Sequence, residues 1–382
     1  MVTSIENKNS KVVQNKPIDF ILLVDVLIML ALGIVMVMSA SSPTSLAETG
    51  KSYTYVKTQA ISAVLGLIGM FIISKINYNL YKKFYKLIYF VVVVLLASVA
   101  VIGKGAGGAK RWIDLGFISF QPSELAKIGL IIFYSALLSN NKERISQLWG
   151  GFLYPMLFLV PVVGILIGVQ NHLSATILIV AIVSVLMLMA GSKFRYFVSF
   201  GVPGVGILGT IMLVYAKATG KGAFRINRLV AFLDPFADVK ETGWQIVQSL
   251  YAIGSGGLFG VGLGNSTQKY LYLPEAHNDF IFSIIAEELG FVGCIFVIAL
   301  FAIFIWRGII IAMKAPDMFS SLLAVGITTM VGLQAIINIA VVTSSMPNTG
   351  MPLPFFSYGG TSLLIMLCSV GILLNISRCA KK

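Results

Sequence analysis

Long runs without a charged residue dominate the chain and predict membrane-spanning helices. A helix that crosses a bilayer needs ~20 apolar residues, with a range of about 17–25. Single spans are predicted by the charge-free runs 26–47, 58–74, 87–103, 196–216 and 289–306, the last extended back to about Asp279. Two longer runs predict two spans each, one divided near Gln170–Asn171 and the other near Pro347–Pro354.

One further span depends on where its helix begins. Run 128–141 is too short by itself and reaches full length only if the helix starts near Pro122. Proline suits the first turn of a helix. This start places Glu124 and Lys127 inside the span, and it brings the prediction to an all-α polytopic bundle of about ten membrane helices.

Composition agrees with a lipid environment. Of the 382 residues, 57% are hydrophobic and only 11% are charged, whereas soluble domains carry roughly 25% charged residues. The net charge of +13 does not indicate nucleic acid, because a nucleic-acid binder keeps its basic face in water. Cationic loops beside anionic headgroups or phosphate ligands explain the charge better. Three cysteines and two histidines, without metal-ligand spacing, predict neither a disulfide framework nor a dedicated metal site.

The distribution of Lys and Arg predicts the orientation. An even number of spans puts both ends on one side, and cytoplasmic ends place 16 Lys/Arg inside and 11 in outer loops. We therefore expect a cytoplasmic tail at 1–18, a single membrane domain at 19–377 and a cytoplasmic tail at 378–382. A large extracytoplasmic loop at about 217–278 would join the seventh and eighth spans. A cleavable signal peptide is not expected, since the segment up to Lys16 is polar.

Two groups of charged residues are candidates for chemistry. Glu124 and Lys127 are i,i+3 neighbours on one helix face, and ionisable groups at membrane depth usually line a cavity. A structural ion pair between helices explains them as well. Arg225 and Arg228 have the same spacing and form either a cationic face for phosphate or the polar side of an interfacial helix.

Three segments near the outer face contain further candidates. The glycine-rich stretch Ser249–Lys269 lacks the ending of a phosphate-binding P-loop and predicts a tight re-entrant or interfacial loop. Asp279 stands where a polar loop enters an apolar helix, so it is either a helix cap or a general base. Three prolines in Ser344–Ser362 forbid a regular helix, and such backbone at membrane depth must be buried or line a cavity.

Together these segments resemble the shape, elongation, division and sporulation (SEDS) family of bacterial membrane proteins, which includes FtsW, RodA and SpoVE. The resemblance covers nearly the whole chain. Its most specific pieces are KRWIDLGFISFQPSELAK, AFLDPFAD, QSLYAIGSGGLFGVGLGNSTQKYLYLPEAHNDFIFSIIAEELG and MPNTGMPLPFFSYGGTS. It implies a peptidoglycan glycosyltransferase that uses lipid II, ten helices, and a class B penicillin-binding protein as transpeptidase partner, together with divisome or elongasome proteins.

The resemblance also assigns site residues. The essential Asp of the family falls on Asp279, where Asn278 replaces the usual Thr. The Glu and Lys of the fourth helix fall on Glu124 and Lys127, and the Arg-Trp pair falls on Arg111 and Trp112. One departure is larger. Gln170-Asn171-His172-Leu173-Ser174 stands where the family often has Gln-Pro-Asp-Leu-Gly, and we interpret His172 as a polar residue at a helix end.

The mechanism expected from this resemblance uses Asp279 to deprotonate or orient the acceptor hydroxyl. The leaving pyrophosphate would be stabilised by Arg111 and Lys127, with Lys110, Arg225 or Arg228 as further candidates, and a divalent cation such as Mg²⁺ or Mn²⁺ would assist.

Glu124 would hold Lys127 in place. The alternatives are a lipid II flippase and a non-catalytic scaffold that recruits a transpeptidase. Ala276 within Pro-Glu-Ala-His favours the division or sporulation branch over the elongation branch. The partners expected are lipid II and membrane lipids, without nucleic acid.

Overall fold

The protein is a helical bundle, described here from a computed structural model. The structure describes residues 17–103, 105, 110–114, 119–201, 203–204, 206, 210, 232, 234–236 and 243–379. Its first elements are α1 (Phe20–Thr49), α2 (Thr54–Ile73), α3 (Asn79–Lys83), α4 (Tyr85–Ile102), β1 (Ile113–Asp114), β2 (Ser119–Phe120), α5 (Pro122–Asn140) and a 3₁₀ turn (Lys142–Arg144). A π-helical turn (Trp149–Leu153), α6 (Tyr154–Gly168), α7 (Leu173–Ala190), α8 (Phe194–Tyr196) and a second π-helical turn (Phe197–Gly201) follow. The chain continues through α11 (Trp244–Ser255), α12 (Ile281–Met313), α13 (Met318–Val342) and α14 (Gly360–Arg378).

Within the described residues, nine helices are long and apolar enough to cross a membrane. Their positions confirm the predicted division of the long runs, since α6 and α7 separate at residues 169–172 and α13 and α14 separate at residues 343–359. The helix predicted to begin near Pro122 begins at that residue. Most of the predicted span 196–216 lies outside the described residues, as do the tails 1–16 and 380–382.

The first span differs from the prediction because its helix begins earlier. Asp19 caps α1 by accepting a hydrogen bond from the backbone N–H of Leu22. The helix therefore includes Asp25, which the charge-free run had excluded. Asp25 is buried, and neither carboxylate oxygen has a hydrogen-bond partner among the described residues.

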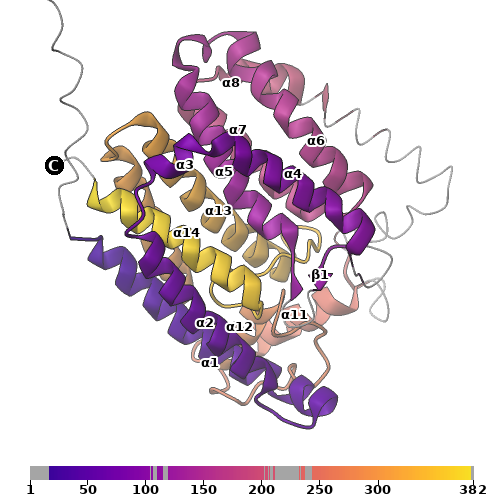
Figure 1. Cartoon of the computed structure of the whole chain (residues 1–382). Helices are drawn as coiled ribbons and strands as arrows, with labels where there is room; N and C mark the ends of the chain where they lie inside the picture. Colours follow the sequence, from indigo (N-terminus) through magenta and orange to yellow (C-terminus); the bar gives the residue numbers. More distant parts are fainter. Residues whose placement is uncertain are drawn as a thin grey trace, which may run out of the picture.

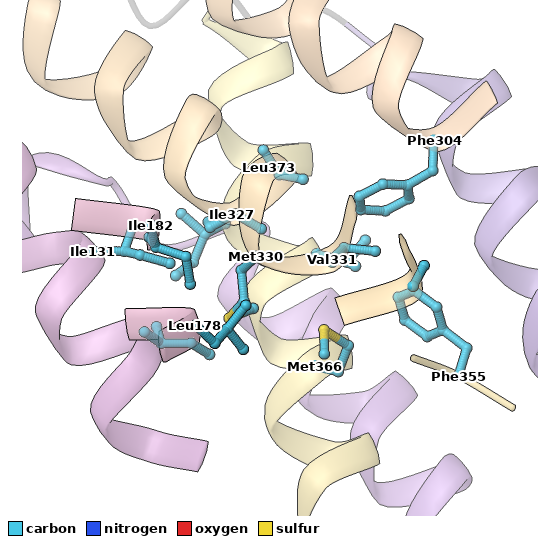
Figure 2. Packing of buried hydrophobic residues seen from close by; sticks show 14 of the residues in the cluster. Ile131, Leu178, Ile182, Phe304, Ile327, Met330, Val331, Phe355, Met366 and Leu373 are labelled. Atoms are coloured by element: carbon cyan, nitrogen blue, oxygen red, sulfur yellow. The ribbon is translucent and has the colours of Figure 1, made fainter. Parts of the chain in front are cut away.

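The core of the bundle is built around α5 and α13. Buried residues make up 94% of the apolar stretch of α5 and 67% of that of α13, compared with 17% for α4. Figure 2 shows Ile327, Met330 and Val331 of α13 between Ile131, Leu178 and Ile182 on one side and Phe304 and Phe355 on the other. Polar side chains on α5 and α13 are thus surrounded by protein rather than lipid.

The described chain begins and ends at the same end of the bundle. The backbone N–H of Asp19 donates a hydrogen bond to Ser377 Oγ over 3.1 Å, and the start of α1 lies beside the end of α14 (Figure 1). Arg307 Nε lies 3.2 Å from Asp19 Oδ1, which ties α12 to this end as well. The elements β1 and α11 lie at the opposite end (Figure 1), where the unusual polar residues gather.

The glycine-rich loop packs against a break in α12. Gly290 has φ +68° and ψ −166°, which interrupts the helix. The loop supplies replacement hydrogen bonds between backbone groups. Val261 N–H donates to the backbone oxygen of Glu287 over 2.9 Å, and Phe291 N–H donates to the backbone oxygen of Gly257 over 2.9 Å. The predicted tight loop is thus present from Gly256 onward. Its first residues, Ser249–Ser255, are helical instead and form the second half of α11.

Candidate active site

Asp279 lies directly before Phe280, the residue that precedes α12. It belongs to the end of the bundle that carries β1 and α11 (Figure 1), here called the mouth. Its backbone oxygen accepts a hydrogen bond from Asn338 Nδ2 over 2.7 Å, and the same nitrogen donates to the oxygen of Met351 over 2.7 Å. A Cβ at Gly350 would stand 3.1 Å from Asp279 Oδ2, so the carboxylate lies against this glycine. One buried amide of α13 therefore joins Asp279 to the proline-rich segment between α13 and α14.

The two residues before Asp279 are attached to the same segment. Ser357 Oγ donates to the oxygen of Asn278 over 2.6 Å, and Tyr358 N–H donates to the oxygen of His277 over 2.9 Å. The ring of His277 packs against the rings of Tyr55 of α2, with centroids 4.8 Å apart, and Tyr358, with centroids 5.7 Å apart. Burial lowers the pKa of His277 below its ordinary value, so the imidazole is neutral near pH 7. These contacts hold the backbone of the two residues before Asp279 in place.

Arg111 lies across the mouth from this segment. Its Nη2 donates to the backbone oxygen of Asn171 over 2.9 Å, and its Nε donates to the backbone oxygen of Gln170 over 3.4 Å. The side chain is half-buried, which lowers its pKa, and the negative charge of Asp279 partly offsets that effect. The turn between α6 and α7 thus holds a guanidinium within electrostatic reach of the Asp279 carboxylate.

Glu124 and Lys127 form the ion pair that the helix start at Pro122 implies. Lys127 Nζ lies 2.8 Å from Glu124 Oε2, and the lysine is only 3% exposed. A cavity of about 20 Å³ adjoins Glu124, and Gln334, Leu353 and Ser357 also line it. A space of that size holds about one water molecule. The ammonium of Lys127 is enclosed by protein, because the side chain is almost fully buried.

His172 belongs to the same neighbourhood. Its Nδ1 lies 3.4 Å from Gln121 Nε2 and 3.4 Å from Ser123 Oγ, at the start of α5. Burial first, and then the positive charges of Arg111 and Lys127, lower its pKa from 6.5 to about 3. His172 is therefore neutral, and it joins the N-terminal ends of α5 and α7.

A second polar cluster holds the glycine-rich loop that leads to Asp279. Lys269 Nζ lies 2.9 Å from Glu288 Oε1 and 3.0 Å from Ser39 Oγ of α1. Glu287 accepts hydrogen bonds of 2.9 Å from both the N–H and the hydroxyl of Thr267. Both carboxylates are almost fully buried. This cluster is satisfied internally, and its role is to anchor the loop rather than to meet a ligand.

Comparison with known proteins identifies the family. The family model for FtsW, RodA and SpoVE, described as cell cycle protein, matches residues 20–382. The chain belongs to this FtsW/RodA/SpoVE family. The match begins at the first residue of α1 and includes every membrane helix that the structure describes, which identifies a multi-pass membrane protein.

Individual family members match over nearly their full length. The chain is 41% identical to a probable peptidoglycan glycosyltransferase FtsW of a Geobacter species, with 94% of this chain and 96% of the relative covered. It is also 41% identical to stage V sporulation protein E of Bacillus subtilis, covering 94% and 97%.

Solved structures agree. A chain of a peptidoglycan synthase complex, described as coordinating polymerization and crosslinking, matches with a TM-score of 0.76 and 29% identity, covering 94% and 98%. The rod shape determining protein RodA of Thermus thermophilus matches with a TM-score of 0.70 and 28% identity, covering 96% and 98%.

For this FtsW/RodA/SpoVE family member, the structure brings together only some of the residues selected from the sequence. Asp279 lies within electrostatic range of Arg111, and His172 lies within range of both Arg111 and Lys127, the partner of Glu124. Lys110 is exposed, and its Nζ donates to the oxygen of Ala100 at the end of α4 over 3.3 Å. Arg225 and Arg228 lie outside the described residues.

Sequence reasoning missed one residue of this site. Asn338 was passed over because it lies within a long charge-free run, where an isolated amide was the available signal. His172 stands at a helix end, as interpreted, because it is the N-cap residue of α7, but its side chain makes no cap hydrogen bond there and lies near the start of α5 instead.

Proposed function

We propose that this protein is a peptidoglycan glycosyltransferase that polymerises lipid II into glycan strands at the outer face of the bacterial cytoplasmic membrane. Relatives named peptidoglycan glycosyltransferase FtsW, and the likeness to a chain of a peptidoglycan synthase complex, support this activity. The relatives that carry division and sporulation names support septal or spore wall synthesis as its setting.

The observation that carries the proposal is the fixed position of Asp279 opposite Arg111. In the reaction, an acceptor sugar hydroxyl attacks the anomeric carbon of the donor sugar. The new glycosidic bond forms as the bond from that carbon to the phosphate oxygen breaks. Asp279 takes the hydroxyl proton as general base, and the lipid pyrophosphate leaves with the electron pair. Arg111 lies where it can meet that developing negative charge, because a guanidinium forms strong paired bonds with phosphate.

The buried pair contributes by its field. Lys127 is almost fully buried, and Glu124 holds its ammonium in one place over 2.8 Å. In a low-dielectric site a fixed charge stabilises a developing anion without reorganisation. Lys127 therefore favours the charged leaving group even though its own ammonium is enclosed.

A divalent cation fits this mouth only with help from the substrate. Among the described residues, no group of three or more His, Cys, Asp or Glu side chains could hold a metal ion. Mg²⁺ commonly binds through one or two carboxylates together with substrate phosphates. One oxygen of the Asp279 carboxylate would hold the cation and the other would remain for the hydroxyl proton, and Mg²⁺ or Mn²⁺ would neutralise charge on the pyrophosphate.

The remaining proposals concern orientation and partner. We infer cytoplasmic ends from the excess of Lys and Arg in the predicted inner segments, and this puts the Asp279 mouth on the extracytoplasmic side. The adjacency of Asp19 and Ser377 supports a common side for both ends. A class B penicillin-binding protein is the proposed partner, since crosslinking must follow polymerisation.

Proteoliposomes test the activity against the flippase alternative. Protein is reconstituted together with its transpeptidase partner, and labelled lipid II is added only to the outside of sealed vesicles. A polymerase makes glycan chains from this pool, because its substrate needs no transport. Inward movement of label without any polymer would support the flippase. Neither polymer nor transport, together with normal binding of the transpeptidase, would support the scaffold.

A further inference from the structure

The side chain of His172 points toward the start of α5 and not toward α7, the helix that it precedes. His172 is the residue before α7, yet it makes no side-chain hydrogen bond to the first turn of that helix. Its Nδ1 is instead 3.4 Å from both Gln121 Nε2 and Ser123 Oγ, at the start of α5. The ring therefore connects the N-terminal ends of α5 and α7 through Nδ1. Its second nitrogen, Nε2, takes no part in these contacts.

The neighbour on Nδ1 determines where the proton lies. The amide nitrogen of Gln121 can only donate, so Nδ1 accepts and the proton of the neutral ring is on Nε2. The ring stays neutral because burial, with the charges of Arg111 and Lys127, lowers its pKa to about 3. His172 thus presents a neutral N–H donor with a defined tautomer.

Within the part of the chain that the structure describes, this donor has no acceptor. Among the described residues, Nε2 makes no hydrogen bond, and it does not belong to the enclosed atoms without partners. His172 keeps part of its surface exposed. Polar groups at a mouth that are fixed in direction and lack a partner are typical of ligand contacts. The cations nearby, Arg111 and Lys127, make an anion the favoured ligand.

We propose that His172 binds the pyrophosphate of the lipid-linked substrate through Nε2–H, as a neutral donor near Arg111 and Lys127. This inference rests on the proposed function and names a further residue that contacts the substrate. A neutral donor stabilises the phosphate oxygens without another desolvated cation in a mouth that already holds two. Its bond strengthens as the bond from sugar to phosphate breaks and charge collects on the leaving group.

Binding of a short analogue tests the contact without turnover. The probe is geranylgeranyl pyrophosphate, with the monophosphate as comparison, titrated calorimetrically into the purified full-length protein. His172→Leu removes the donor, whereas His172→Gln restores an N–H near the position of Nε2. Hydrogen bonds to charged groups are strong, so we expect His172→Leu to weaken pyrophosphate binding about tenfold or more. His172→Gln should stay within about threefold of the wild type.

Controls separate a contact from a packing effect. Ser139→Ala removes a buried hydroxyl of α5 whose hydrogen bond, among the described residues, is to Ala136 of the same helix, and it should leave the affinity unchanged. Thermal unfolding of all variants identifies any that fail to fold, and His172→Gln then decides the outcome. Equal pyrophosphate affinity of wild type and a folded His172→Leu would overturn the proposal, as would equal losses in the Leu and Gln variants.

Polymerisation measured on the same samples keeps the two hypotheses apart. A wild-type protein that polymerises lipid II while His172→Leu matches it in both binding and kcat/KM refutes the role of His172 alone. A wild-type protein that binds the pyrophosphate through His172 but makes no polymer refutes the glycosyltransferase function and leaves the binding contact standing.

Discussion

Asn338 and Asp279 are joined by a 2.7 Å hydrogen bond from the side-chain amide of one to the backbone oxygen of the other. The same amide nitrogen lies 2.7 Å from the oxygen of Met351. Asn338 is 1% exposed and belongs to the most buried part of α13. A single side chain therefore sets the position of the proposed general base relative to the proline-rich segment.

Asn338→Ala should lower kcat much more than it changes KM for lipid II. The substitution removes the amide that donates to the buried carbonyl of Met351 and to the part-buried carbonyl of Asp279, and an unsatisfied buried group costs about 1–3 kcal/mol. The measurement is steady-state polymerisation with thermal unfolding in parallel. Thr328→Ala on the same helix is the control, because within the described part of the chain the Thr328 hydroxyl donates its hydrogen bond to Ala324 of α13 itself. Wild-type kcat in Asn338→Ala would contradict the positioning role.

Lys269→Met should destabilise the protein strongly. Glu288 is fully buried, and its partner at 2.9 Å is the Lys269 ammonium. Removing one member of a buried pair leaves an uncompensated charge, which costs about 3–5 kcal/mol. The double variant Lys269→Met, Glu288→Met should recover much of that loss. Unfolding free energies in a membrane mimetic check this, and a double variant less stable than Lys269→Met would refute it.

Gly290→Ala should be among the most damaging single changes in α12. A side chain at φ +68° is strained, and the added Cβ would stand 2.3 Å from the nitrogen of Gly260. We expect a loss of several kcal/mol, since overpacking costs about 1–3 kcal/mol and the strained backbone adds to it. Gly164→Ala in α6 is the matched control, because its Cβ meets nothing within 4 Å and alanine favours helix by up to about 1 kcal/mol.

Acidification should destabilise the protein partly through His172. Its pKa is about 3 in the folded protein and 6.5 ordinarily. The unfolded chain therefore binds the additional proton, and stability present above pH 6.5 is lost as the pH falls toward 3. Between pH 7 and pH 5 this amounts to about 2 kcal/mol. His277 shifts in the same direction, so His172→Gln should flatten the unfolding curve against pH without levelling it. Parallel curves for wild type and variant would contradict the shift.

The sequence predicted helices better than it predicted the site. Charge-free runs locate spans because lipid forbids unpaired charges, and the Pro122 start followed from length alone. The charge-free run placed Asp25 outside the first span, whereas the helix includes it, because a carboxyl that is buried by protein can lie inside a membrane helix. The pairing of Lys269 with Glu288 depends on how the glycine-rich loop folds back on α12. Nothing in the local sequence encodes that contact, and the same holds for the bond between Asn338 and Asp279.

Polymerisation by Asp279→Ala tests the central claim most directly. The variant is purified with its partner transpeptidase, given labelled lipid II, and compared with the wild type for glycan chain formation and thermal stability. The Asp279 side chain can be removed while its backbone oxygen still accepts from Asn338, so the fold should persist. We predict a folded variant whose polymerisation rate falls by at least about 100-fold, as expected when a general base is lost. Wild-type-like polymer from Asp279→Ala would contradict the account.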